Sequence, residues 1–585
     1  MTGAEGVRWD LTLLAPSEQA MKDRLERGVA DAAAFVERWR AETIAAVEPA
    51  GLAELLRELA ELRATRTEGE WWAFLLVQAD SENPATFDVQ AWVDSRLPHF
   101  DEAIRHFENG WLELADDRAE TLALDESVGH DRHYLLSLRR FRPFLLSPAE
   151  ERVLAAREAS ASTAWKSLYS HTLGALAARF DDGGGERTWP LSELQLARAT
   201  HPQRDVRRRA TAATQTLLEP VLPVLAQCWD AVLADHISLD ALRGHADPME
   251  PRNLENEIEA SVVEGLLSAA EAHYDLGHRW FRVKARLLGV ERLDTIDRVA
   301  PVLETSPVSW DEGQRLAVEV FADLAPALGV AAEAFFRERR IDAELRRGKR
   351  LGFFSISPST RVPGFILVSW TGQLRSLVAL THELGHGTHL ALAAKAQSDN
   401  SFNPGLTIAE VPSTFAQLLL VDQMLASDHE LGRAALVSAL DDAVINLFMS
   451  TAFARSERAA YGLRAEGQAL THERLSDLFD AEMAKVWGEA MSDELGFRKL
   501  TWAGAPFIYW RFYTYAYVFA FLVAAGLLSR SREPGFGARY ERFLSAGGSD
   551  SPEALLRILG VDLRDPGLWD EGFAVIESWL DTMST

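Results

Sequence analysis

The spacing of apolar residues indicates α-helix along most of the chain. In residues 17–47 and 147–180, apolar side chains recur every three or four positions, as they do along one face of an amphipathic helix. The second segment opens with Ser147, Pro148 and Glu150, which predict an N-cap, a first-turn proline and a capping-box acid. The chain shows no internal repeat with a period of about 20 to 50 residues. We therefore predict a mostly α-helical protein that is not a solenoid.

Two segments depart from the helical pattern. Residues 180–189 read FDDGGGERTW, in which glycines separate two short extended pieces, so we predict a small hairpin and a seam between lobes. Residues 361–370 read RVPGFILVSW and are rich in apolar and β-branched side chains, which favour a strand. We therefore expect a small β element shortly before the apolar helix predicted for residues 372–397.

One long apolar segment, residues 512–529, bears on the class of protein. It carries no charged side chain and just reaches the length of a membrane-spanning helix. Arg511 and Arg530 flank it closely, three tyrosines lie in its first half, and the chain has no second segment of this kind. A buried helix of a large helical protein accounts for these features better, and a membrane protein is the weaker alternative.

Composition narrows the range of partners. The 585 residues are 47% apolar, which suffices for a large buried core and sets a prior of about four domains. Asp and Glu outnumber Lys and Arg by 87 to 60, and the resulting net charge of −27 repels phosphate. Nucleic acids and anionic membranes are therefore not expected as partners.

The single cysteine, Cys228, excludes an intrachain disulfide and a thiolate metal cluster, and its apolar neighbours indicate a core position. The first residues, MTGAEGVRWDLTLLAP, lack the basic and apolar regions of a signal peptide. We therefore expect a cytoplasmic protein in a reducing compartment.

The strongest chemical motif lies in an apolar helix predicted for residues 372–397. It reads HELGH from His382 to His386, and the i, i+4 spacing places both imidazoles on one helix face, where they can bind one zinc ion. Glu383 lies beside them without needing to bind the metal. It can therefore take a proton from the water that such an ion activates and pass it to a leaving amine.

The alternative is a helix whose two histidines only make hydrogen bonds in a core. Gly385 and Gly387 each cost about 1 kcal/mol relative to alanine inside a helix, which indicates that another part of the protein approaches the helix closely. A charged Glu383 between apolar turns also needs a strong partner such as a metal site. These features favour zinc binding over the core alternative.

A hydrolytic zinc site needs a third protein ligand. His389 shares the helix face of the motif, but three imidazoles at this spacing crowd one another, so we expect His389 to line the site in a role toward substrate. Glu410, in the helical segment 403–420, is the better candidate, because a helix, a turn and a second helix bring it back alongside the first. It could instead complete a capping box with Thr407, although Pro412 fits that alternative poorly.

The motif HELGHGTH, followed by AEVPSTF, resembles the oligoendopeptidase F branch of the thimet-oligopeptidase family of zinc metallopeptidases. Further similar blocks follow one another along most of the chain, among them WDLTLLAPSEQA, YLLSLRRFRPFLLSPAEERVL, RATHPQRDVRRRATAA and GKRLGFFSIS. The resemblance implies a mostly helical, two-lobed architecture around a deep substrate channel, with zinc at its floor. It also implies an N-terminal helical domain over residues 1–195 and a catalytic domain over residues 196–585.

The same resemblance implies a role for each residue of the motif. His382, His386 and Glu410 would hold one zinc ion per chain, and Glu383 would be the general base. The substrates would be short unstructured peptides cleaved internally, because only a thin chain enters the channel.

The predicted strand before the motif would take part in substrate binding. In the implied architecture the strand around Phe365 and Val368 lies along the channel. There it would pair with the peptide backbone, which gives affinity with little sequence preference.

Tyr509, Tyr513 and Tyr517 are spaced i, i+4 and i+8, so on a helix their hydroxyls point the same way. Facing the zinc, Tyr513 and Tyr517 would donate hydrogen bonds to the oxyanion formed during amide hydrolysis, and Tyr509 would contact substrate. An aromatic core helix with satisfied hydroxyls is the alternative. Relatives usually carry a histidine a few residues before these tyrosines, where this chain has Phe507.

We therefore predict a cytoplasmic zinc oligoendopeptidase in which Glu383 activates the attacking water. The alternative from another class is a catalytically impaired zinc protein that only binds peptides, which the missing histidine near Phe507 suggests. A membrane peptidase is a weaker alternative.

Overall fold

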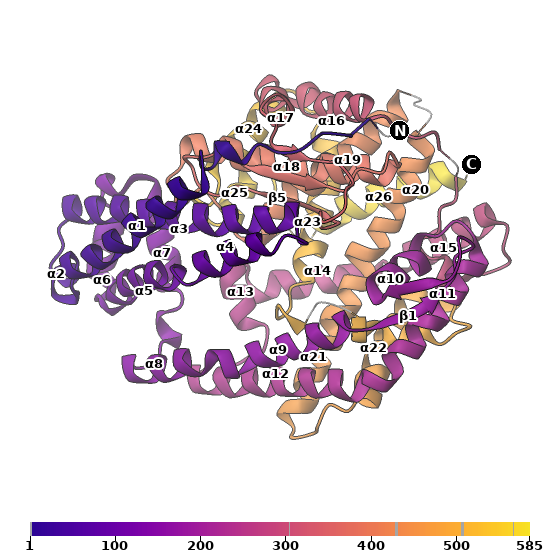
Figure 1. Ribbon diagram of the computed structural model, residues 1–585, viewed down its shortest axis with the longest axis horizontal. Coiled ribbons are helices and arrows are strands. Elements are labelled where there is room, and N and C mark those ends of the chain that lie inside the picture. Colours follow the sequence, from indigo (N-terminus) through magenta and orange to yellow (C-terminus); the bar gives the residue numbers. More distant parts are fainter. Residues whose placement is uncertain (1–2, 304, 428–430, 505–507, 566, 585) are drawn as a thin grey trace. The chain divides into compact units, whose positions relative to one another are not determined.

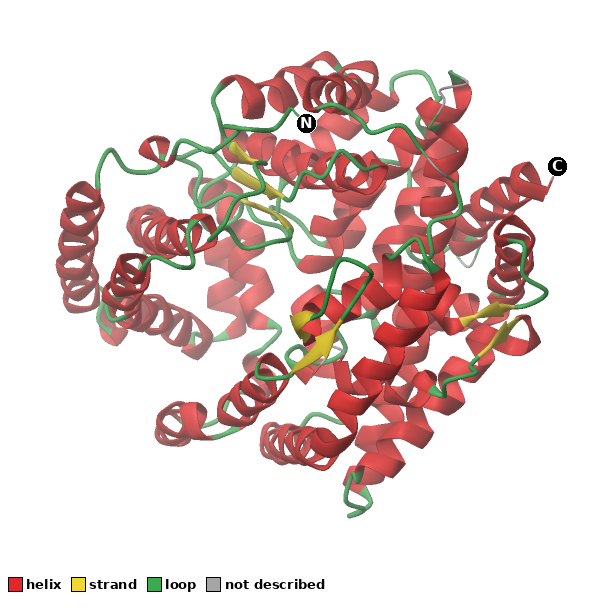
Figure 2. Ribbon diagram, turned by 45° about the vertical axis from the view of Figure 1, so that its right-hand side comes forward, coloured by secondary structure: helices red, strands yellow, loops and turns green. Residues whose placement is uncertain are grey.

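The computed structural model describes residues 3–303, 305–427, 431–504, 508–565 and 567–584. Helices account for most of these residues, and the strands are short (Figure 2). Within the described ranges the strands form one three-stranded sheet and two two-stranded sheets. The prediction of a mostly α-helical protein with a small β element is confirmed.

Contacts between residues divide the chain into two compact units, each assembled from three separate segments. Unit 1 consists of Met1–Pro143, Thr305–Ala435 and Leu527–Asp565. Unit 2 consists of Phe144–Glu304, Leu436–Gly526 and Pro566–Thr585. The boundary predicted between residues 195 and 196 falls inside unit 2. The division into an N-terminal and a catalytic domain therefore does not coincide with the compact units, and it stays a prediction.

The first segment of unit 1 is helical in its described residues. Its elements are η1 (Leu11–Leu13), α1 (Glu18–Arg38), α2 (Ala41–Ala45), α3 (Pro49–Ala79), α4 (Pro84–Asp94), α5 (Leu97–Glu113), α6 (Asp116–Ala123), η2 (Glu126–Asp131), α7 (Arg132–Arg139) and η3 (Arg142–Phe144). Leu25, Phe100 and Trp111 belong to an apolar core that also contains Ile356 and Phe365. The N-terminal helices therefore share one core with the strands that lie far along the sequence.

The remainder of unit 1 carries the three-stranded sheet and the longest apolar helices of this unit. Its elements are α16 (Trp310–Leu324), α17 (Pro326–Arg337), β4 (Ile341–Asp342), β5 (Phe353–Ile356), β6 (Phe365–Val368), α18 (Leu374–Ala396), α19 (Leu406–Ala426), α24 (Phe536–Ala546) and α25 (Pro552–Arg557). Two α-helices contain a unit boundary, α20 (Gly432–Ala443) and α23 (Tyr515–Arg530), and so does the short helix η3.

The three-stranded sheet supports the helix that carries the HELGH motif. Its strand order is β4-β6-β5, with β6 parallel to β4 and antiparallel to β5. Lys349 is buried behind it, where its Nζ lies 3.0 Å from a carboxylate oxygen of Asp342 and donates to the main-chain oxygen of Val368. Helix α18 follows β6 in the chain and packs against β5 and β6 (Figure 1).

Unit 2 consists mainly of helices. Its elements are α8 (Pro148–Arg157), η4 (Glu158–Ser160), α9 (Ser162–Gly174), β1 (Ala177–Phe180), β2 (Arg187–Pro190), α10 (Leu191–Thr200), α11 (Arg204–Leu218), η5 (Glu219–Val221), α12 (Leu222–Arg243), α13 (Glu250–Asn256), α14 (Ala260–Ala272), α15 (Tyr274–Leu288), β3 (Leu293–Asp294), η6 (Thr295–Asp297), the π-helical turn η7 (Val444–Met449), α21 (Ser450–Ala465), α22 (His472–Trp487), η8 (Gly488–Ala490), β7 (Met491–Ser492), η9 (Phe497–Gly504) and α26 (Leu568–Ser584). Strands β3 and β7 pair in parallel.

Several local predictions are confirmed. Strands β1 and β2 form the expected antiparallel hairpin around the glycines of residues 183–185, but the hairpin lies wholly within unit 2 and is not a seam between units. Ser147 and Glu150 form both hydrogen bonds of a capping box at the start of α8. Cys228 is a free thiol in the core.

The apolar segment 512–529 forms the buried helix that its sequence favours, since Val518 and Phe519 of α23 are fully buried. Two other stretches, Arg204–Arg243 and Gly432–Ala465, are long and apolar enough to cross a membrane by length and composition. In their most apolar windows, 44% and 72% of the residues are buried inside the structure. Core helices pass the same test, so two such stretches are weak evidence for a membrane protein.

Candidate metal centre

Helices α18 and α19 lie unusually close together at Gly385. A Cβ atom built on Gly385 would lie 2.5 Å from Ser413 Cα and 2.7 Å from the main-chain oxygen of Pro412. On the other side of α18, a Cβ atom on Gly387 would lie 2.5 Å from the ring of Phe335 in α17. The prediction that other parts of the protein approach this helix at both glycines is confirmed. Each glycine is required because even one methyl group would clash.

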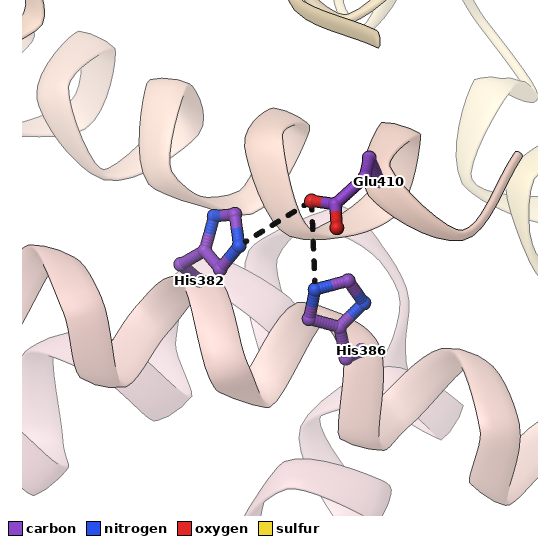
Figure 3. A group of neighbouring side chains, drawn as sticks. All are labelled: His382, His386 and Glu410. Carbon is purple, nitrogen blue, oxygen red and sulfur yellow. Dashed lines mark ion pairs between the residues drawn. The ribbon is translucent and has the colours of Figure 1, made fainter. Parts of the chain in front are cut away.

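The close approach brings Glu410 of α19 opposite the two histidines of α18 (Figure 3). A carboxylate oxygen of Glu410 lies 3.7 Å from Nε2 of His382 and 3.7 Å from Nε2 of His386. One potential ligand atom from each of the three residues lies within 4.8 Å of the others. This donor set, two imidazoles and one carboxylate, is the set that catalytic zinc sites use while one position stays open.

The capping-box alternative for Glu410 is not realised. Helix α19 begins at Leu406 with Gly405 as its N-cap, so Thr407 lies inside the helix and not at its cap. Pro412 also lies within the helix. Glu410 is instead free of a capping role and points at the two imidazoles (Figure 3).

Gln417 orients His382, and the sequence alone did not single it out. Its side-chain oxygen accepts a hydrogen bond from Nδ1 of His382 at 2.9 Å, which leaves the Nε2 lone pair directed at Glu410. Gln417 lies seven residues after Glu410 on α19, which is two helical turns along the same face. That spacing is the signal that would have identified it. His386 is held in a similar way by the main chain of Ala409.

Burial dominates the electrostatics of the site. It lowers the pKa of His382 and of His386 to about 4, so both imidazoles are neutral and able to act as ligands at pH 7. Burial, followed by the charge of Glu410, raises the pKa of Glu383 to about 8. Burial likewise raises the pKa of Glu410. Two buried carboxyl groups beside each other favour a bound cation, whose positive charge stabilises their ionised forms.

His389 is buried one turn further along α18, with 1% of its surface exposed. Its ring stacks on Phe543 at a centroid distance of 6.0 Å, and its Nε2 has no hydrogen-bond partner among the described residues. Burial lowers its pKa to about 3. The structure therefore places a neutral imidazole in the core beside the motif, and the role toward substrate stays a prediction.

The prediction that the strand around Phe365 and Val368 pairs with substrate is wrong. This strand, β6, is the centre of its sheet and is hydrogen-bonded to β4 on one side and β5 on the other. Both side chains are fully buried. A central strand offers no free backbone groups, so β6 supports α18 from behind and β5 is an edge strand of the described sheet.

The three tyrosines do not share a helix. Helix α23 begins at Tyr515, and Tyr509 and Tyr513 lie in the turns before it, so the predicted i, i+4, i+8 series is wrong. Tyr509 instead hydrogen-bonds Ser170 through its hydroxyl at 2.6 Å. The hydroxyls of Tyr513 and Tyr517 nevertheless meet at 2.8 Å, as a pair of partly exposed groups.

The three tyrosines belong to unit 2, whereas the three candidate metal ligands belong to unit 1. Their proposed action on the substrate therefore stays a prediction. Phe507, the position where the resemblance leads us to expect a histidine, lies outside the described residues.

Sequence profiles of two known protein families match parts of this chain. Residues 318–575 match the sequence profile described as peptidase family M3, and residues 111–177 match the profile described as oligopeptidase F. The first match contains α18 and α19, the two helices that carry the candidate metal ligands.

Relatives match over most of their length. The chain is 25% identical over 512 residues to group B oligopeptidase PepB of Streptococcus agalactiae, covering 84% of this chain and 83% of the relative. It is 24% identical over 484 residues to oligopeptidase PepF of Bacillus subtilis, covering 81% and 71%. The fold matches oligoendopeptidase F of Enterococcus faecium with a TM-score of 0.71 over 97% of both chains at 20% identity. The two profile matches and the similar relatives therefore confirm the resemblance to the oligoendopeptidase F branch of peptidase family M3.

Proposed function

We propose that this peptidase is a zinc-dependent endopeptidase that hydrolyses internal bonds of short unstructured peptides. The proposal rests on one observation: His382, His386 and Glu410 each place a potential ligand atom within 4.8 Å of the others. Glu383 lies on α18, next to His382 in the sequence. The names of the relatives PepB and PepF, both called oligopeptidases, support peptides as the substrate class.

The three side chains fit one zinc ion per chain. They offer two neutral imidazole nitrogens and a carboxylate oxygen, and the hydrogen bond from His382 to Gln417 presents the correct nitrogen. Zinc held there supplies Lewis-acid polarisation of the scissile carbonyl and of the attacking water.

Glu383 would move the proton. Its carboxylate accepts a proton from the attacking water and then delivers it to the nitrogen of the leaving amine. Its position inside a buried site keeps bulk water from competing for that proton, since only 7% of the residue is exposed.

Other residues would orient the peptide. The paired hydroxyls of Tyr513 and Tyr517 are suited to donate hydrogen bonds to the oxyanion, as the resemblance implies, and Tyr509 and His389 stay candidates for substrate contact. The edge strand β5 replaces β6 as the place for peptide backbone, because an extended peptide adds to a strand that has a free edge. We further propose a cytoplasmic location, with neither nucleic acid nor membrane as a partner.

The competing function is a zinc protein that binds peptides without cleaving them, for which Phe507 in place of the usual histidine is the specific reason. A peptide library analysed by mass spectrometry, with and without chelator, separates the two. We expect chelator-sensitive internal cleavage of peptides of about 5 to 20 residues and no digestion of a folded protein. Efficient digestion of a native folded protein would contradict the channel architecture that the resemblance implies.

Two variants assign the roles. Glu383→Gln should retain zinc and peptide affinity while turnover falls by at least about 10²- to 10⁴-fold, because its amide cannot accept the proton. His386→Ala should lose zinc, because two ligands do not close the site. If the wild-type protein binds library peptides as well as Glu383→Gln does and cleaves none, the peptide-binding function is correct.

A further inference from the structure

The turn before α23 contains a strained residue. Phe512 has a φ of +48°, in the left-handed region that a bulky side chain rarely adopts. Such a conformation is strained, and it persists only where its surroundings hold it. The side chain of Phe512 is fully buried, whereas the next residue, Tyr513, is partly exposed. The unusual φ therefore turns Phe512 inward and Tyr513 outward.

A buried acid holds this conformation. The side chain of Glu457, on α21, is 3% exposed, and one of its oxygens accepts the main-chain N–H of Phe512 at 3.0 Å. Burial raises the pKa of Glu457 to about 8. Burying a carboxyl group is costly, and neither zinc binding nor proton transfer in the proposed mechanism uses this one.

Side chains from two helices fix the position of Phe512 around that hydrogen bond. The ring of Phe512 stacks on Tyr461 of α21, with centroids 5.3 Å apart and planes at 25°. The guanidinium of Arg511 lies 4.9 Å from the centre of the Tyr461 ring. It also donates a hydrogen bond to the carboxylate of Asp240, on α12, at 2.9 Å. The Tyr461 hydroxyl in turn lies 2.6 Å from Nδ1 of His236.

Helix α13 holds the turn at its two ends. Arg252 donates from Nε to the main-chain oxygen of Arg511 at 2.8 Å. Asn256 donates to the hydroxyl of Tyr515, the first residue of α23, at 2.8 Å. Between these contacts the N–H of Phe512 is tied to the buried carboxyl group of Glu457. Its position decides where the following residue, Tyr513, meets Tyr517.

We propose that Glu457 is a positioning residue for the Tyr513–Tyr517 hydroxyl pair. It anchors the left-handed Phe512, and so sets the geometry in which the two hydroxyls meet. The inference rests on the proposed function, in which these hydroxyls act on the substrate. Glu457 touches neither substrate nor metal in this scheme, and it acts through the backbone of Phe512.

The test compares two substitutions of Glu457. Glu457→Gln keeps a carbonyl oxygen that can accept the Phe512 N–H, whereas Glu457→Ala removes the acceptor. Asp441→Asn is the matched control, because Asp441 is another buried acid of unit 2 and it contacts Trp280 and Lys284 instead of the turn. All four proteins, including the wild type, are measured as full-length, zinc-loaded chains.

The first readout is amide hydrogen exchange of residues 508–517, which needs no activity. In Glu457→Ala the Phe512 amide should exchange at least about fivefold faster, which corresponds to the loss of one hydrogen bond. Glu457→Gln and Asp441→Asn should leave this segment at the wild-type rate. Unchanged exchange in Glu457→Ala would overturn the proposal, as would equal acceleration in the Gln variant.

The second readout is the separation of kcat from KM for a library peptide. Glu457→Ala should lower kcat by about 10- to 100-fold with KM within about twofold of wild type, because misplaced hydroxyls weaken the transition state. Glu457→Gln should restore most of kcat. A loss in Glu457→Ala no larger than in Asp441→Asn would make Glu457 merely structural and overturn the proposal. If the wild-type protein cleaves nothing, the proposed function fails, and the exchange of Phe512 still decides whether Glu457 anchors the turn.

Discussion

Gly385 sets the distance between α18 and α19, the two helices that carry the proposed metal ligands. The backbone of α19 at Pro412 and Ser413 occupies the space where any side chain at position 385 would lie. Backbone atoms cannot move aside as the end of a flexible side chain can. The alignment of Glu410 with both histidines therefore depends on the absence of one methyl group.

Gly385→Ala should weaken zinc binding, because it pushes α19 and its Glu410 away from α18. We expect a loss of zinc affinity of at least about tenfold and a fall in the free energy of unfolding of about 1–3 kcal/mol, as for overpacking in a core. Zinc titration and urea denaturation measure both.

Gly462→Ala is the control for this substitution. Gly462 is an exposed helical glycine of α21 with nothing within 4 Å of a built Cβ. Replacing it should stabilise the protein by about 0.5–1 kcal/mol with zinc affinity unchanged. Normal zinc binding in Gly385→Ala would show that α19 is not held by this contact.

Glu457 should make stability depend on pH. Its pKa rises from 4.5 to about 8 on folding, so between these values the folded protein keeps a proton that the unfolded chain releases. The stabilisation that Glu457 contributes to the free energy of unfolding is complete below pH 4.5 and is lost as the pH rises to about 8. The positive charges of Arg511 and Arg252 face this carboxyl and oppose the shift. Burial lowers the pKa of the nearby His236 to about 3. Because wild type and Glu457→Gln both contain His236, its effect on the free energy of unfolding cancels when the two proteins are compared.

The free energy of unfolding of wild type relative to Glu457→Gln should therefore fall between about pH 5 and about pH 8.5. A decline on the order of a few kcal/mol follows from the size of the shift. Urea denaturation of both proteins at the two pH values measures it. If the free energies of unfolding of wild type and Glu457→Gln change with pH in parallel, the pKa of Glu457 is not raised in the folded state.

At the scale of elements, Glu68 joins three parts of unit 1. This residue of α3 is 1% exposed, and its carboxylate accepts from Arg24 of α1 at 2.6 Å. It also accepts from Ser359 at 2.6 Å and from Arg361 at 3.0 Å, both in the connection between β5 and β6. The sheet behind α18 is therefore tied to the N-terminal helices by one buried carboxylate.

Glu68→Ala should reduce the free energy of unfolding by about 3 kcal/mol. This is the lower end for a broken buried ion pair, since both arginines are partly exposed. Hydrogen exchange should accelerate in β5 and β6. The control Glu54→Ala removes an exposed pair with Arg38 and should cost much less than Glu68→Ala, because solvent screens an exposed pair. Equal costs for the two variants would show that the Glu68 network adds nothing beyond a surface pair.

At the scale of the whole molecule, both compact units are assembled from segments that alternate along the sequence. All three proposed zinc ligands belong to one of them, unit 1. A metal that joins α18 to α19 should therefore stabilise unit 1 locally.

Removing zinc should lower the free energy of unfolding by RT ln(1 + [Zn]/Kd), which is about 4 kcal/mol when zinc exceeds its Kd a thousandfold. Hydrogen exchange with and without chelator should accelerate in α18 and α19 and stay unchanged in α12 of unit 2. His386→Ala should not respond to chelator at all. A chelator effect of the same size in that variant would place the stabilising metal elsewhere.

Much of this organisation follows from the sequence alone. Apolar residues at helical spacing predict α18 and α19, and HELGH predicts two metal ligands, because i and i+4 share a face in every α-helix. The glycines of the motif indicate a close approach, because glycine inside a helix is costly and needs a compensating contact. The structure confirms the two helices and the close approach, because each depends on neighbours within a few residues, and the two metal ligands stay a prediction.

Tertiary structure decided the rest. Whether Phe365–Val368 is a central or an edge strand depends on β4 and β5, which no local pattern in β6 reveals. The predicted tyrosine series is wrong because α23 begins only at Tyr515, after a turn in which the left-handed Phe512 donates its N–H to Glu457, 55 residues earlier in the chain. The capping-box alternative for Glu410 was excluded by where α19 begins, and the position of Glu410 opposite the two histidines depends on which helix α19 packs against. Contacts between distant segments fixed these three features, since local propensity is too weak to oppose them.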